Sequence, residues 1–78
     1  MELRAVQEVL KEERLDGWLL YSFGGSNPLA LEVLGLAHLH LTRRFAYLIP
    51  REGAPTLLCH AIEASLFPPL PGNRKTYH

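Results

Sequence analysis

The fold is decided by the stretch Thr42–Glu63, which reads TRRFAYLIPREGAPTLLCHAIE. It contains two short apolar runs, Phe45–Ile49 and Thr56–Cys59, and neither is long enough for a free-standing helix. Residues 50–55 between them combine two prolines with a glycine. This is the composition of a turn, because proline lacks a backbone donor and glycine tolerates positive φ. The stretch therefore predicts two antiparallel strands joined by a short loop.

Such a hairpin needs other elements to cover it. Both predicted strands are apolar at consecutive positions, which is typical of a sheet with helices on each side. A two-stranded hairpin alone is marginally stable in water. We therefore expect the remainder of the chain to cover the hairpin on both faces.

The chain before the hairpin predicts a helix, a strand and a second helix. Apolar residues at helical spacing, with charged residues opposite them, predict an amphipathic helix over residues 2–14. The pair Asp16-Gly17 is expected to end it, with the glycine in a left-handed exit. The apolar run 18–21 then predicts a buried strand. Asn27 is a suitable N-cap for a short helix over residues 28–34.

The remaining segments complete a small mixed α/β layer. Residues 36–41 are expected to form a connector or an irregular edge strand, and residues 61–66 a short helix that ends before Pro68 and Pro69. Residues 75–78 resemble the start of a further element. With three strands recognised, residues 1–78 are expected to form a single, truncated domain with a small mixed sheet and flanking helices.

The apolar runs and the helical stripe also predict the core. Its main members are expected to come from the first helix, the second helix and all three strands. They are Leu3, Val6, Leu10, Trp18, Leu20, Leu34, Phe45, Tyr47, Ile49 and Leu57.

Composition and charge exclude several classes of function. The 78 residues are 47% hydrophobic and 21% charged, with eight basic and eight acidic side chains, so the chain is globular and formally neutral. A neutral chain gives no electrostatic reason to expect nucleic acid or a membrane surface as a partner. No apolar run approaches the roughly 18 residues of a membrane span. A single cysteine and a charged N-terminus make the cytoplasm the expected compartment.

Histidine and cysteine side chains are the first candidates for metal binding or nucleophilic catalysis. His38 and His40 would lie on one face of a strand, but zinc requires three or four ligands and no second cluster is near them. Cys59 and His60 are neighbours and would point to opposite faces, so they do not form a dyad. Ser26 lacks the flanking spacing of a nucleophile elbow. We therefore assign no catalytic residue and no metal ligand, and expect Cys59 to be buried.

Two polar features are candidates for binding. The Gly24-Gly25 loop precedes a helix start, where an anion can bind, although a turn followed by an N-cap explains the same residues. Arg43 and Arg44 would place one guanidinium on each side of a strand, where a carboxylate is a natural partner, or they form a solvated strand start. Arg43, Arg44 and Asn27 are therefore the candidates for an interface or for substrate access.

Several blocks of the chain resemble the N-terminal domain of creatinase/prolidase-type metallopeptidases, the family of the Xaa-Pro dipeptidases and aminopeptidases. The resemblance covers nearly the whole chain. One departure is the segment Glu32-Val33-Leu34, where the family often has an aromatic residue and a threonine before the glycine. The blocks are Asp16-Gly17, Ser26–Ala30, Leu34–Leu36, Leu41–Arg44, Tyr47–Pro50, Gly53-x-Pro55, Leu58, His60-x-Ile62-Glu63, Leu70–Gly72 and Tyr77.

The resemblance implies a ribonuclease-H-like α/β domain that assists dimer assembly and closes over the substrate entrance. In that family a divalent metal centre, with manganese or cobalt, lies in a separate C-terminal domain, and none of its ligands maps onto this sequence. The chain is then expected to be non-catalytic, to hold no cofactor and to form a homodimer. The alternatives are a small stand-alone enzyme or anion-binding protein that uses Gly24-Gly25, Arg43 and Arg44, and a free-standing interaction module.

Overall fold

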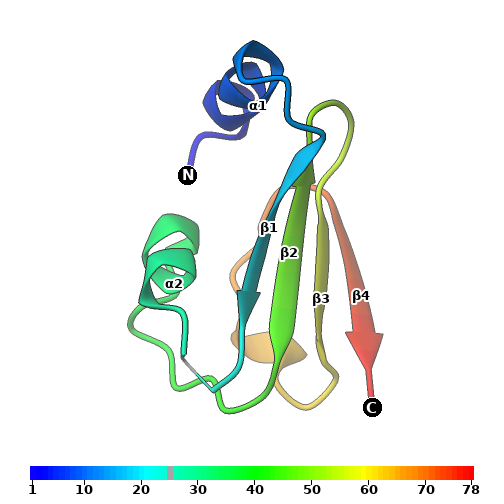
Figure 1. Cartoon of the computed structure of the whole chain (residues 1–78). Helices are drawn as coiled ribbons and strands as arrows, with labels where there is room; N and C mark the ends of the chain where they lie inside the picture. Colours follow the sequence, from blue (N-terminus) through cyan, green and yellow to red (C-terminus); the bar gives the residue numbers. More distant parts are fainter. Residues whose placement is uncertain (25) are drawn as a thin grey trace.

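The computed structural model describes residues 1–24 and 26–78, which form a small mixed α/β domain with two α-helices and a four-stranded sheet (Figure 1). The helices and strands follow one another along the chain without a repeat. They are α1 (Leu3–Glu12), β1 (Gly17–Ser22), α2 (Pro28–Leu34), β2 (Phe45–Pro50), β3 (Thr56–His60), the 3₁₀ turn η1 (Ala64–Leu66) and β4 (Asn73–Tyr77).

The sheet has the strand order β1-β2-β3-β4. β1 and β2 are antiparallel, as are β2 and β3, so the hairpin predicted from the sequence is confirmed. β3 and β4 are parallel, and Leu57 lies opposite Arg74. A parallel pair requires a crossover, which residues 61–72 provide.

The fourth strand is the element that sequence analysis missed. The segment expected to begin a further element belongs to β4, which pairs with β3. Four of the five β4 residues are exposed, because β4 lies at the edge of the sheet, and its polar sequence carries no apolar run. The helix expected over residues 61–66 is also wrong in extent. Only Ala64–Leu66 are helical, since the two prolines that follow leave room for little more than one turn.

The helices cover only one face of the sheet, which we call the inner face. Leu10 of α1, Ala30 and Leu34 of α2 and Phe67 after η1 join the inward side chains of the strands in one core. In Figure 1 the near face of the sheet carries no helix. The expectation of helices on both faces is therefore wrong, because both α-helices and the crossover pack on the inner face.

Most of the predicted core is confirmed. Three predicted members, Leu3, Val6 and Trp18, are partly buried and pack against the core. The sequence did not identify buried residues in the connector and in the crossover, because these segments have no periodic pattern. The predicted residues that are buried are Leu10, Leu20, Leu34, Phe45, Tyr47, Ile49 and Leu57; the additional ones are Ala30, Leu36, Leu41, Cys59 and Phe67.

The first helix ends differently from the prediction. The left-handed residue is Arg14, with φ of 57°, and not Gly17. Gly17 instead begins β1, where an added Cβ would lie 2.9 Å from the Ile49 carbonyl oxygen of β2. Its role is therefore close strand packing.

The crossover is held to the sheet by hydrogen bonds to backbone carbonyls. The buried Tyr47 hydroxyl donates to the Pro71 carbonyl oxygen at 2.6 Å, and the Asn73 amide donates to the Pro55 carbonyl oxygen at 2.8 Å. From β4, the Arg74 guanidinium donates to three carbonyl oxygens of the crossover at 2.9 to 3.5 Å. These contacts place the start of β4 beside β3.

Gly72 provides a test of this junction, with Gly53 as its matched control. Both glycines have a φ near 95°, but an added Cβ at Gly72 would fall on the Pro55 carbonyl, whereas at Gly53 it meets open space. We expect Gly53→Ala to destabilise the fold by about 1 kcal/mol through backbone strain alone, and Gly72→Ala by roughly twice that or more. Chemical denaturation of both variants measures the difference. Equal losses of stability would show that the junction is not close-packed.

Candidate functional site

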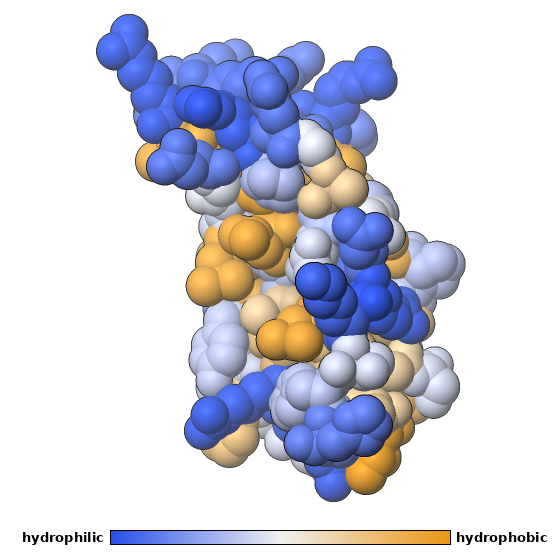
Figure 2. Space-filling model, turned by 90° about the vertical axis from the view of Figure 1, so that its right-hand side faces the viewer, coloured by the Kyte–Doolittle hydropathy of each residue, from blue (hydrophilic) through white to orange (hydrophobic). Residues whose placement is uncertain are grey.

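The candidate site is the uncovered face of the sheet, which we call the outer face. Strand side chains alternate between the faces, so the residues between the buried ones point outward. Leu19, Tyr21, Leu48 and Leu58 are 59%, 44%, 47% and 42% exposed. Figure 2, which views the molecule from the β4 side, shows apolar atoms in the middle, below the hydrophilic end at α1, and a mixture of polar and apolar atoms at the opposite end.

The strand register places these side chains side by side. Leu19 lies opposite Leu48 across β1 and β2. A second row crosses all four strands and consists of Tyr21, Ala46, Leu58 and Lys75. The outer face is therefore a contiguous apolar surface with a lysine at its β4 edge.

A hollow of about 280 Å³ lies at one end of the outer face. The Tyr77 hydroxyl donates to the Arg44 carbonyl oxygen at 2.6 Å, and the His60 and Tyr77 rings form a T-shaped pair with centroids 5.1 Å apart. These contacts fix one aromatic wall of the hollow. It is lined by Tyr21, Arg44, Phe45, Ala46, Leu58 and Tyr77.

The Arg44 guanidinium lies over the Phe23 ring, with its central carbon 4.8 Å from the ring centroid. Stacking of this kind holds a cation at a defined place and leaves its edge donors free. Within residues 1–24 and 26–78, the one ion pair joins Lys11 to Glu52 at 3.8 Å, so Arg44 has no carboxylate partner there. Arg44 is thus a positioned cation at the rim of the hollow.

Arg43 lies in a different environment. Both arginines precede β2, which begins at Phe45, so they do not form part of the strand as the sequence analysis assumed. The Arg43 amide donates to the Glu63 carboxylate at 3.1 Å, while its side chain is exposed. Of the two arginines, only Arg44 lines the hollow.

Asn27 is the N-cap of α2, as the sequence predicted. Its side-chain oxygen accepts from the Ala30 amide at 3.1 Å, and its side-chain nitrogen donates to the Tyr21 carbonyl oxygen at 2.9 Å. Both ends of the side chain therefore hold α2 against the edge of β1. The Gly24-Gly25 loop is described only in part: Gly24 has a φ of 57°, and Gly25 lies outside the described residues.

The histidines and the cysteine lie apart. His38 and His40 are exposed on the connector, and Cys59 and His60 point to opposite faces as expected. Burial raises the pKa of the Cys59 thiol, which disfavours the reactive thiolate. Among the described residues there is no group of three or more side chains that could hold a metal ion. No helix in that part of the chain has the length and apolar character needed to cross a membrane.

Glu63 is a buried charged residue that the sequence analysis did not single out. Its carboxylate accepts from the Thr42 amide at 2.8 Å, the Thr42 hydroxyl at 3.0 Å and the Arg43 amide at 3.1 Å. Burial alone would raise the pKa of this carboxyl group, but the hydrogen bonds and the Arg43 charge outweigh burial, and the pKa lies below its ordinary value. In the sequence, Glu63 lies between Ile62 and Ala64, and an acidic residue in such an apolar segment was the signal that could have identified it.

No protein-family model matches this chain, and no curated protein matches its sequence. The resemblance to the metallopeptidase family therefore stays a prediction.

Glu63 links stability to pH. Because its pKa is lower in the folded chain, the carboxylate stabilises the fold above the unfolded pKa of about 4.3, and this contribution is lost as the pH falls further. We expect Glu63→Gln to lower the unfolding free energy at pH 7 by about 2 kcal/mol and to flatten the decline below pH 4.3. The exposed Glu52→Gln should change stability by under about 0.5 kcal/mol. Urea titrations across this pH range measure both, and an unchanged acid profile would contradict the role of Glu63.

Proposed function

We propose that this chain is a non-catalytic assembly domain, similar to the ribonuclease-H-like N-terminal domain of creatinase/prolidase-type metallopeptidases. In this proposal the domain forms a homodimer and borders a substrate entrance. The observation that carries the proposal is the contiguous apolar outer face. The sequence blocks that resemble that family are the reason for comparing this chain with its N-terminal domain.

A contiguous apolar surface favours association over solvation. Exposed apolar patches beyond a few hundred Å² are unusual on soluble monomers and mark interaction sites. Each large apolar side chain that becomes fully buried contributes about 1.5–3 kcal/mol. Leu19, Leu48 and Leu58 lie on three adjacent strands, so one docking surface can bury all of them.

The same proposal assigns catalysis and metal binding to another part of a larger assembly. Manganese or cobalt, which the family resemblance implies, would be held outside this chain. Arg44, fixed over Phe23 at the rim of the hollow, is the side chain best placed to meet a carboxylate at a substrate entrance. Arg43 and Asn27 would support the same rim through their contacts with Glu63 and Tyr21.

Light scattering coupled to size-exclusion chromatography tests the proposal. We expect the wild-type chain to be dimeric and Leu48→Lys, in the centre of the outer face, to raise the dimer dissociation constant at least about tenfold. Ile62→Lys is the matched control, because Ile62 is 68% exposed and lies outside the four strands. Thermal melts confirm that both variants fold. A wild-type chain that stays monomeric at high concentration would overturn the proposal.

A further inference from the structure

We propose that the groove between α1 and β1 is a second docking surface, which binds a basic amphipathic helix of a partner protein. The groove lies on the inner face of the sheet, because Leu10 belongs to the core there and Val6 and Trp18 pack against that core. The outer face lies on the opposite side of the sheet. This inference therefore goes beyond the proposed dimer contact and does not depend on it.

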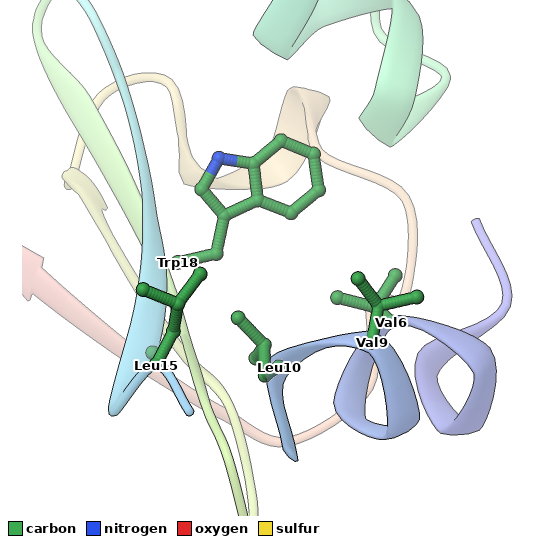
Figure 3. Close-up of a pocket in the computed structure, with 6 residues that line it drawn as sticks. Val6, Val9, Leu10, Leu15 and Trp18 are labelled. Carbon is green, nitrogen blue, oxygen red and sulfur yellow. The ribbon is translucent and has the colours of Figure 1, made fainter. Parts of the chain in front are cut away.

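The groove is apolar and open, with a volume of about 360 Å³. Figure 3 shows Trp18 and Leu15 on one side of it and Val6, Val9 and Leu10 on the α1 side. Gly17 completes the lining. Val9 and Leu15 are 54% and 50% exposed, so an apolar partner in the groove would remove both side chains from water.

Contacts with the loop between β2 and β3 fix which side of α1 borders the groove. The Gln7 side-chain nitrogen donates to the Gly53 carbonyl oxygen at 2.9 Å. The Lys11 ammonium pairs with the Glu52 carboxylate at 3.8 Å. Gln7 and Lys11 each lie two positions from Val9 and therefore point away from it on the helix surface. The loop thus holds a basic side chain on the far side of α1 and leaves Val9 at the groove.

The charge beside the groove is negative. Glu12 and Glu13 follow Val9 by three and four positions, which places them next to it on the helix surface, and both are exposed. Asp16 is exposed in the turn that leads into β1. Residues 12–16 contain three acids and one arginine. A partner that combines apolar side chains with lysine or arginine therefore matches the groove in polarity and in charge.

Other occupants fit the groove less well. A second copy docked groove to groove would bring the same acids together, which is unfavourable. A small molecule would find a pocket near the lower limit of the usual range, about 300–1,000 Å³, and the side chains that line it carry no charge to orient a ligand. The favoured occupant is thus a segment of another protein.

The wall that α1 provides favours a helix as that segment. The backbone groups of α1 are hydrogen-bonded within the helix, so an extended segment could make no backbone hydrogen bonds to this wall. A helix pairs its own backbone groups internally and presents apolar side chains every three or four residues. Lysine and arginine beside these apolar residues would then meet the acids of residues 12–16.

Fluorescence titration tests the inference, because Trp18 is the single tryptophan of the chain and lines the groove. The probe is a synthetic helix of about 15 residues with leucine on one face, lysine on the other and no aromatic residue. We expect it to shift the Trp18 emission to shorter wavelength, saturably and with one peptide per chain. Two control peptides, with serine in place of leucine or glutamate in place of lysine, should bind at least about tenfold more weakly.

Variants of the chain locate the binding site. Val9→Lys, and Glu12→Lys combined with Glu13→Lys, should each raise the dissociation constant of the leucine-lysine peptide at least about tenfold. Glu32→Lys on α2 and Leu48→Lys on the outer face are the matched controls and should change it less than about twofold, because neither residue lines the groove. Thermal melts confirm that each variant is folded.

The inference would be overturned by a wild-type chain that does not bind the leucine-lysine peptide, by a control peptide that binds equally well, or by binding that Val9→Lys leaves unchanged. A monomeric wild-type chain that binds the peptide as expected would overturn the proposed dimer and leave this inference standing. A dimer that binds no peptide would overturn this inference alone.

Discussion

Each strand of the sheet places half of its side chains on each face, and the described elements cover only one of these faces. α1, α2 and the crossover all pack on the inner face, where Leu20, Tyr47 and Leu57 are buried. The strands carry leucines and a tyrosine on the outer face as well. An apolar outer face follows directly from this imbalance, and the proposed assembly role depends on it.

The inner face is completed by segments without regular structure, and polar contacts fix these segments. Tyr47 and Arg74 hold the crossover through backbone carbonyls, and Glu63 holds the end of the connector through the Thr42 and Arg43 amides. The connector in turn brings Arg44 over Phe23 at the rim of the outer face. A buried carboxylate on the inner side thus helps to set the position of a cation at the outer hollow.

The sequence predicted those parts of the fold that rest on local patterns. Periodicity identified α1, proline and glycine located the hairpin turn, and Asn27 marked the start of α2. β4 was missed because an edge strand needs no apolar run. One-sided coverage and the different contacts of Arg43 and Arg44 depend on long-range packing, which no local pattern encodes. For the same reason, Leu36 and Leu41 were not recognised as core residues.

The central claim is that a second copy buries the outer face. Isotope-filtered nuclear Overhauser spectroscopy on a mixture of leucine-methyl-labelled and unlabelled protein tests it most directly. We expect intermolecular contacts at the Leu48 and Leu58 methyl groups and none at Leu66, which lies on η1 and is as exposed as Leu48. Outer-face methyl groups that show no intermolecular contact and stay accessible to a soluble relaxation agent at high protein concentration would contradict it.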